Sequence, residues 1–350
     1  MDFSLFYFAD DSGAAATNRY ELLLAGARFA DTHDFTAVWT PERHFHPFGG
    51  LYPNPSVTSA AIAVATERVA IRAGSVVAPL HHPLRIAEEW SVVDNLSGGR
   101  VGISFASGWH ADDFALMPDA YEGRQQATVD LLTQVRDLWR GKAMSVRNGV
   151  GDPLDVRIHP QPVQPDLPTW VTTAGSPETF QAAGRVGAGI LTHLWLQDVD
   201  QLAAKIDAYR QALRERPDDD GWPGHVVVML HCALGADTDE VRELVREPML
   251  DWLRSSFNLV AATARNHLGG YDPTKAKPEH REFLIKRSFD RYFPGTGLFG
   301  SVDTAREMVE RLRAIGVDEV AGLIDFGLTV PQTLTSLEYV DVLRRECQDT

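Results

Sequence analysis

The sequence has few of the features that mark secreted, membrane-embedded or thiolate-metal proteins. Its 350 residues include only two cysteines, Cys232 and Cys347, far apart in the chain. Two isolated thiols exclude a disulfide framework and a thiolate metal site. No apolar run approaches the roughly 18 residues that span a bilayer, and the N-terminus is too short and too acidic for a secretory signal. We therefore expect a soluble, cytoplasmic protein.

Positive charge is also scarce. Lys and Arg total 33 against 48 Asp and Glu, which gives a net charge of -15. Such a surface repels nucleic acid, so we expect no nucleic-acid partner. No Gly-x-Gly-x-x-Gly follows the first apolar segment, which counts against a dinucleotide-binding fold. Hydrophobic residues make up 44% of the chain, enough for a large buried core.

Short runs rich in β-branched and aromatic residues alternate with amphipathic stretches. Strands are expected at 3–8, 36–40, 69–77, 101–105, 169–173, 189–193, 226–232 and 320–325. Helices are expected at 18–32, 56–66, 83–96, 123–139, 177–184, 199–215, 237–255 and 331–346. Eight strands alternating with helices predict a (β/α)8 TIM barrel of the α/β class, formed by a single domain over residues 1–350. An open doubly wound sheet is the alternative.

Three stretches exceed the minimal barrel repeat. They are the loop at 45–55, a polar, Pro-rich stretch at 141–167 and a long excursion at 257–300. Loops that follow the strands of a barrel line its catalytic, C-terminal face. We interpret these stretches as insertions at that face that build lids and pockets. Surface excursions without a function are the alternative.

The segment after the second strand holds an acid, a guanidinium and two imidazoles: Glu42, Arg43, His44 and His46. The carboxyl end of a barrel strand is where such enzymes keep their chemistry. This position predicts a catalytic role for His44. A loop held by a Glu42–Arg43 salt bridge is the alternative.

The same histidines allow a second interpretation, as the start of an amidohydrolase-type metal site. His193 and Asp325 would then be further ligands. However, the pair follows the second strand rather than the first, and the fifth strand ends without a ligand. We therefore expect no metal.

Two further strand ends suggest a ligand with a phosphate and a flat ring. The fifth strand leads into Ala174, Gly175 and Ser176 at a helix start, where free N–H groups and the helix dipole can bind phosphate. An ordinary N-cap is the alternative there. The third and fourth strands end in small residues, with room for a flat ring against the backbone. Rim packing alone would also explain those small residues.

The sequence resembles the bacterial luciferase-like flavin monooxygenases, most of all the subgroup associated with natural-product assembly lines. The resemblance extends from about residue 3 to 340 and includes the turn at Gly175–Ser176. The motifs that carry it are VWTPERHF at 38–45, FGGLYPNP at 48–55, HPLRIAEE at 82–89 and VVDNLSGGR at 92–100.

The resemblance implies a barrel that binds FMN across its strand ends. Relatives carry a non-proline cis peptide at the third-strand bulge, expected here at Ser75–Val76. The implied cofactor-binding residues are Ser75, Val76, Ser104, Ala106, Trp109, Ala174, Gly175, Ser176 and Thr179. The implied catalytic residues are His44, beside the reactive edge of the flavin, then Arg43 and His110.

One departure from the family affects the expected reaction. Bacterial luciferase has Glu-His-His-Phe where this chain has Glu42-Arg43-His44-Phe45, and the histidine replaced by Arg43 matters for light emission. Bioluminescence is therefore in doubt, and we expect a hydroxylase or oxidase. Arg43 is suited to hold either an anionic reduced flavin or a substrate carboxylate.

The resemblance implies an FMN-dependent monooxygenase that acts on a secondary-metabolite intermediate, free or held on a carrier protein. A separate reductase would supply reduced FMN, and His44 would act as the controlled proton donor or acceptor. The family also implies a homodimer formed through the helices beside the second and third strands. A deazaflavin-dependent oxidoreductase and a non-catalytic flavin-binding barrel are the alternatives.

Overall fold

Eight parallel strands close into a barrel in the computed structural model, which describes residues 1–11, 18–195, 197–217, 221–264, 275 and 277–348. The strands pair in the order β1-β2-β3-β4-β7-β8-β9-β11, and β11 pairs with β1 to complete the ring. They are β1 (Asp2–Phe6), β2 (Ala37–Thr40), β3 (Ala70–Val77), β4 (Val101–Ala106), β7 (Thr169–Thr172), β8 (Gly189–His193), β9 (Val226–Gly235) and β11 (Glu319–Leu323). The predicted TIM barrel is confirmed, and the open sheet is excluded.

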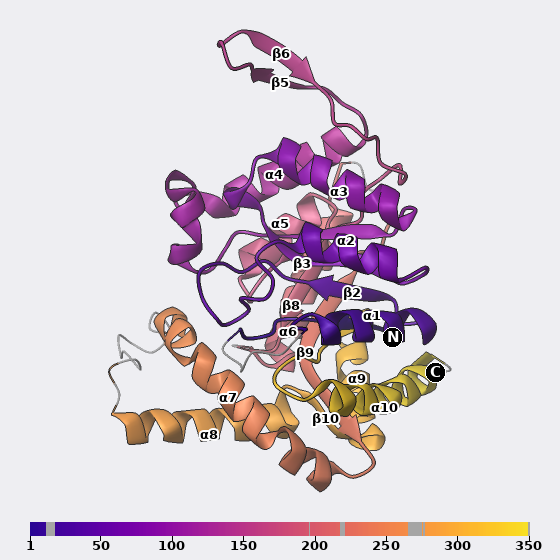
Figure 1. Cartoon of the computed structure of the whole chain (residues 1–350), viewed down its shortest axis with the longest axis vertical. Coiled ribbons are helices and arrows are strands. Elements are labelled where there is room, and N and C mark those ends of the chain that lie inside the picture. The colour runs from indigo at the N-terminus through magenta and orange to yellow at the C-terminus, as the bar shows by residue number, and fades with distance from the viewer. Residues whose placement is uncertain (12–17, 196, 218–220, 265–274, 276, 349–350) are drawn as a thin grey trace.

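Eight helices surround the barrel (Figure 1). They are α1 (Glu21–Thr32), α2 (Pro55–Ala65), α3 (Pro83–Ser97), α4 (Arg124–Trp139), α5 (Pro177–Arg185), α6 (Val199–Arg214), α9 (Val302–Ala314) and α10 (Val330–Gln348). Local sequence sets several helix starts. The side chain of Asn54 caps α2 by accepting from the N–H groups of Ser56 and Val57, and Asp198 and Gln201 form a capping box on α6.

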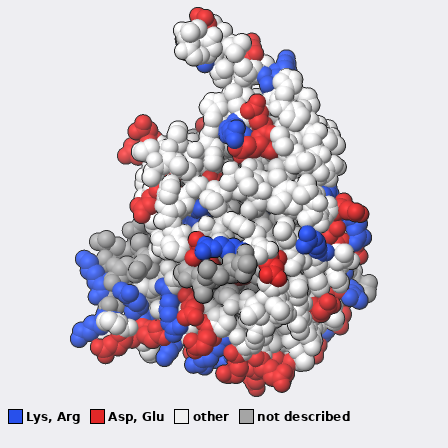
Figure 2. Space-filling view, viewed as in Figure 1, with Lys and Arg blue, Asp and Glu red and all other residues white. Residues whose placement is uncertain are grey.

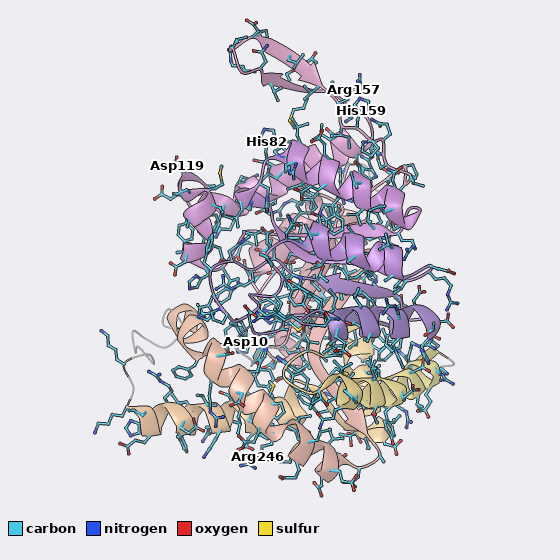
Figure 3. The ribbon with its side chains drawn as sticks, in the orientation of Figure 1. Asp10, His82, Asp119, Arg157, His159 and Arg246 are labelled. Carbon is cyan, nitrogen blue, oxygen red and sulfur yellow. The ribbon has the colours of Figure 1, made fainter. Side chains whose placement is uncertain are left out.

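The predicted stretch at 141–167 contains an antiparallel hairpin made of β5 (Met144–Arg147) and β6 (Pro153–Val156). The hairpin projects away from the barrel at the top of Figure 1. Figure 3 places Arg157 and His159 at its base, where the chain returns to the body. This stretch therefore forms an arm that points away from the barrel, whereas we expected an insertion that lines the catalytic face.

The excursion at 257–300 contains elements that the sequence reading missed. They are the end of α7 (Thr238–Ala264), α8 (Pro278–Gly295) and β10 (Leu298–Ser301); residues 265–274 and 276 lie outside the described part. The helix predicted at 237–255 is present as part of α7. Helix α9, which the sequence did not predict, packs its buried residues into the main core before β11. Strand β10 extends the sheet by pairing with the last residues of β9.

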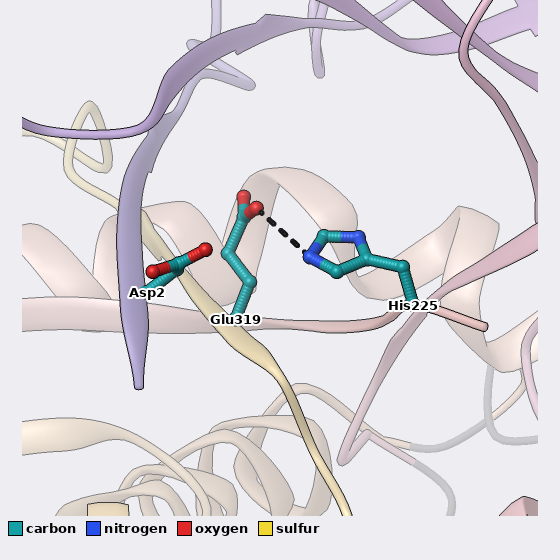
Figure 4. A group of neighbouring side chains, drawn as sticks. All are labelled: Asp2, His225 and Glu319. Atoms are coloured by element: carbon teal, nitrogen blue, oxygen red, sulfur yellow. Dashed lines mark ion pairs between the residues drawn. The ribbon is translucent and has the colours of Figure 1, made fainter. Parts of the chain in front are cut away.

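The amino-terminal end of the barrel is filled by a buried polar group (Figure 4). The carboxylate of Glu319 accepts from Arg72 Nη1 at 2.8 Å, Ser4 Oγ at 2.5 Å and Trp39 Nε1 at 3.0 Å. Asp2 and His225 lie close enough to Glu319 to suggest a cation site. However, Nδ1 of His225 accepts from Trp170 Nε1, and Arg72 already neutralises the carboxylate. The group therefore stabilises the barrel floor.

Among the described residues, no helix is both long enough and apolar enough to cross a membrane. The cytoplasmic location expected from the sequence stays a prediction.

Candidate active site

The carboxyl ends of the strands carry the polar side chains that the sequence singled out. The loop after β2 and the short helices η2 (Ala111–Leu116) and η3 (Pro118–Ala120) lie on the left of Figure 1 with one end of α7. Both chain termini lie on the right. The catalytic face is thus built from loops after β2, β3 and β4 and is flanked by the long excursion after β9.

Glu42 is the buried centre of this face. Its Oε1 accepts from His44 Nε2 at 2.9 Å and from His81 Nε2 at 2.6 Å, and its Oε2 accepts from the N–H of Val77 at 2.7 Å. Burial raises the pKa of Glu42, but the hydrogen bonds from His44 and His81 outweigh that effect and hold the pKa below its usual value. Glu42 is therefore a carboxylate at neutral pH, as the partner of two histidines.

The contact with Glu42 fixes the orientation of His44. Because a carboxylate accepts and cannot donate, Nε2 of His44 carries the hydrogen, and Nδ1 is the nitrogen left for a ligand. His44 also lines a cleft on this face. The loop alternative is excluded, since Glu42 binds two histidines and Arg43 pairs elsewhere. A carboxylate that sets the tautomer of an imidazole at the edge of a cleft is the arrangement found in acid–base catalysis.

Arg43 lies beneath the surface beside this pair. One corner of its guanidinium, Nη1, forms an ion pair with Asp113 of η2, and its face lies 5.2 Å from the ring of Trp109. Burial lowers the pKa of Arg43 while Asp113 raises it. The predicted residues Arg43 and Trp109 are thus in contact, held together by an acid that the sequence reading did not single out.

Two more histidines lie near Arg43. Burial lowers the pKa of His46 and of His110, and the positive charge of Arg43 lowers both further. Nδ1 of His110 accepts from the N–H of Asp112 at 3.3 Å and so caps η2. His110 therefore has a local structural role as well as the predicted catalytic one. Arg43, His44 and His46 line an open cleft of about 380 Å³.

Hydroxyl groups from three strands form a chain at the barrel mouth. Ser104 Oγ lies 2.6 Å from Thr172 Oγ1, which donates to Ser75 Oγ at 2.8 Å. The structure thus brings the predicted residues Ser75 and Ser104 together through Thr172, which the sequence reading missed. Ala106, half-buried, ends β4 above them. The side chain of Val76 packs in the core between strands and helices, so only its backbone can face a ligand in the mouth.

The cis peptide bond lies at Gly74–Ser75, so the expected position at Ser75–Val76 was wrong by one residue. Gly74 pairs with Ser104 and Val76 pairs with Phe105, so the ladder between β3 and β4 skips Ser75. The bulge is therefore centred on Ser75, and the bond on its N-terminal side is the cis one. A side chain at Gly74 would also meet the ring of Phe6 at 2.6 Å.

The turn from β7 into α5 has the features expected of an anion site. Ser176 Oγ caps α5 by accepting from the N–H of Thr179 at 3.4 Å, and Gly175 has a φ of 120° that favours glycine. A Cβ on Gly175 would meet Lys205 Nζ at 3.0 Å and Gln197 Oε1 at 3.2 Å. Lys205 thus brings a cation to this turn, a residue that nothing in the local sequence motif indicated. Ala174 is exposed there.

Helix α7, which follows β9, packs against the loop after β2. Trp252 of α7 packs against Phe48 of the β2 loop, with ring centroids 4.9 Å apart, and against His231 of β9, at 4.4 Å. Burial and the neighbouring His193 lower the pKa of His231 to about 3, so its imidazole is neutral. From the excursion at 257–300 itself, Tyr292 of α8 lies beside the same imidazole, with ring centroids 5.2 Å apart. The lid interpretation of that excursion stays a prediction.

The ligands of the metal-site alternative are not brought together. Nε2 of His44 binds Glu42, Nδ1 of His46 accepts from the N–H of Phe48, and the oxygens of Asp325 accept from Phe8 and Tyr52. Within the described ranges, Asp2, His225 and Glu319 are the only such cluster close enough to share an ion, and they lie at the opposite end of the barrel.

Comparison with known proteins identifies the family. Residues 1–319 match the profile described as Luciferase-like monooxygenase. The chain belongs to this family.

Relatives and solved structures agree with that assignment. The oxygenase component of flavin-dependent trigonelline monooxygenase from Acinetobacter baylyi is 26% identical, covering 97% of this chain and 93% of its own. An alkanal monooxygenase alpha chain from Photobacterium leiognathi is 24% identical, covering 72% and 70%. Monooxygenase RslO1 from Streptomyces bottropensis shares the fold with a TM-score of 0.75, at 21% identity over 99% of this chain and 100% of its own.

Another solved structure with this fold contains FMN. It is the oxygenating constituent of 3,6-diketocamphane monooxygenase from Pseudomonas putida, with a TM-score of 0.74 and 16% identity over 99% of this chain and 97% of its own. The protein is thus a flavin-dependent, luciferase-like monooxygenase by family, and its substrate is not established by these matches.

Proposed function

We propose that this protein is the oxygenase component of a two-component system that uses reduced FMN from a separate flavin reductase. Its substrate would be a small intermediate of secondary metabolism, free or attached to a carrier protein. The observation that carries the proposal is the His44–Glu42 pair, which presents an oriented imidazole to a cleft on the face where the hydroxyl chain and the Gly175–Ser176 turn also lie. The oxygenase-component relative supports the need for a reductase.

The residues of the mouth fit FMN. The turn before α5 offers the N-terminal end of the helix, the hydroxyl of Ser176 and the cation of Lys205 to a phosphate. Glu178 accepts from Ser176 Oγ at 2.7 Å, but it is exposed and can turn to solvent when a phosphate binds. The small side chains of Ser75 and Ala106 at the strand ends would lie beside the ring, as the family resemblance implies for Ser104 and Trp109 as well.

Reduced FMN would supply the two electrons that activate dioxygen. The protein would exclude water with the lid formed by α7 and hold a proton at Nδ1 of His44, with Nε2 anchored on Glu42. Arg43 and His110 would provide charge and a second imidazole beside it. His44 would thus be the one residue that donates or accepts a proton at the reacting atoms.

A direct test compares wild type with His44→Gln. The glutamine keeps a side-chain N–H for Glu42 but cannot exchange a proton near neutrality. We expect an anaerobic titration to give the same affinity for reduced FMN, within about threefold, in both proteins. After mixing with oxygen, the delay before oxidised-flavin absorbance returns should be shorter in the variant by about tenfold or more, because control of proton transfer is lost.

Two outcomes would contradict the proposal. Binding of a reduced deazaflavin in preference to reduced FMN would favour the deazaflavin-dependent alternative. An F420-dependent secondary alcohol dehydrogenase has the same fold as this chain, with a TM-score of 0.70. FMN binding with no effect of the protein on the oxygen reaction would favour the non-catalytic alternative. His82→Gln is the matched control, since His82 is solvent-exposed and caps α3.

A further inference from the structure

Arg43 is held rigidly but is only partly used. Its side chain is 1% exposed, and its stem lies against Gly49, where an added Cβ would meet Arg43 Cγ at 3.0 Å. Asp113 binds the Nη1 corner, and the ring of Trp109 covers one face of the guanidinium at 5.2 Å. Two segments, the loop after β2 and the segment after β4, thus fix the plane of the guanidinium before any ligand arrives.

The rest of the guanidinium has no partner. Nε and Nη2 of Arg43 are buried and form no hydrogen bond in the described structure. These two atoms form one edge of the planar group, away from the Nη1 corner that Asp113 occupies. Buried donors without acceptors are costly, and an arginine edge binds planar groups that present two oxygens side by side. The unpaired Nε–Nη2 edge of Arg43 therefore selects a ligand by its shape as well as by its charge.

Arg43 is the one Lys or Arg residue among the described residues that line the cleft. Arg43 lines the cleft together with His44 and His46, and Phe45 and Pro47 add apolar walls. The pKa values of His46 and His110 are lowered by burial and by Arg43 itself, so both rings are neutral at pH 7. The acid on the rim, Asp11, pairs with Arg19. Asp113 balances the single positive charge of Arg43 but occupies only its Nη1 corner.

We propose that the Nε–Nη2 edge of Arg43 binds a planar anion that presents two acceptors, as a carboxylate does, and that the substrate of this enzyme is a carboxylic acid. That the bound acid is a substrate rests on the proposed function. The binding of an acid to Arg43 does not depend on catalysis. The same edge chemistry suits the ring of an anionic reduced flavin, so the experiment separates the two sources.

The first arm uses probes of equal shape. Benzoate and benzamide, hexanoate and hexanamide, and 2-naphthoate and 2-naphthamide are titrated into the wild-type protein by calorimetry. At least one acid should bind about tenfold more tightly than its amide, because only the acid offers two anionic oxygens to the edge. Arg43→Lys keeps the charge and loses the edge, and should weaken binding of that acid about tenfold without affecting its amide.

The second arm measures the affinity of wild type and Arg43→Lys for oxidised and reduced FMN. If the edge holds the substrate, the ratio of the two FMN affinities stays unchanged in the variant. If the edge holds the anionic flavin, the variant loses preference for reduced FMN by about tenfold while the acids show no preference over their amides. That result would overturn the assignment to a carboxylic acid substrate.

Arg19→Gln is the matched control, because it removes a positive charge at the rim of the same cleft without touching the edge. The acid preference should persist in that variant. Equal binding of every acid and amide, together with an unchanged FMN ratio in Arg43→Lys, would overturn the proposal altogether. The acid-to-amide comparison in wild type needs no variant, so it decides the matter even if Arg43→Lys folds poorly. FMN binding measured in the same series shows separately whether the proposed function fails.

Discussion

Asp325 shows how one buried residue at the barrel mouth couples stability to pH. Its Oδ1 accepts from the N–H of Phe8 at 2.7 Å and its Oδ2 from Tyr52 Oη at 2.9 Å. Burial raises the pKa of Asp325 to about 7, although those two hydrogen bonds favour the carboxylate. Between about pH 4 and pH 7, Asp325 therefore holds a proton in the folded chain that it has already lost in the unfolded chain.

We predict that this carboxyl makes the protein less stable as pH rises through that window. The native state binds more protons than the unfolded state there, so the free energy of unfolding falls as pH increases, by on the order of 4 kcal/mol for a shift of about three pKa units. Asp325→Asn should remove this contribution. Urea unfolding of both proteins at a series of pH values measures it. A difference between the two proteins that does not change with pH would refute the prediction.

At the scale of elements, the β5–β6 hairpin is an arm with little buried surface. Of its strand residues, only Met144, Val146 and Val156 are half-buried, and the others are exposed. The hairpin is held at its base, where Arg157 binds the carbonyl of Gly141 and Ile158 is fully buried.

Shortening the hairpin should therefore leave the barrel intact. Met144 and Val156 lie directly opposite each other, so an Asn-Gly turn can join them in place of residues 145–155. We expect the melting temperature to change by less than about 2 °C, because little apolar area leaves the core. Differential scanning calorimetry measures this. A larger loss of stability would mean that the arm contacts something outside this single chain, such as a second copy.

At the scale of the whole molecule, charge is unevenly distributed. Figure 2 shows many charged side chains around α7 and α8 and few over the region of α2 and α3. Four apolar side chains are exposed on these two helices: Val57 at 65%, Val64 at 72%, Val92 at 44% and Leu96 at 49%. These helices follow β2 and β3, where the family resemblance predicts the homodimer. An exposed apolar face of this kind is typical of a subunit interface.

We predict that wild type is a dimer in solution and that Val64→Asp is a monomer. A buried unpaired carboxylate would oppose association, and a two-fold axis would place one in each subunit. Sedimentation velocity at micromolar concentration measures the mass. Val150→Asp serves as control, because Val150 is even more exposed than Val64, at 82%, but lies at the hairpin tip. A wild-type monomer, or a dimeric Val64→Asp, would show that the interface lies elsewhere.

The alternation of apolar runs and amphipathic stretches determined the eight barrel strands and their order, because each strand and helix reports its own periodicity in local sequence. The same local logic located Glu42, Arg43 and His44 at a strand end and Ser176 at a helix start. It missed α8 and β10, because their stretch mixes a helical pattern with Gly and Pro, and it also missed α9.

Tertiary structure alone decided which side chains meet. Asp113 pairs with Arg43 from 70 residues away, and His81 reaches Glu42 from 39 residues away. Thr172 joins Ser75 to Ser104, and Lys205 comes to Gly175 from another helix. No local pattern encodes such pairs, because closure of the barrel, and not spacing in the chain, brings the carboxyl ends of distant strands to one face.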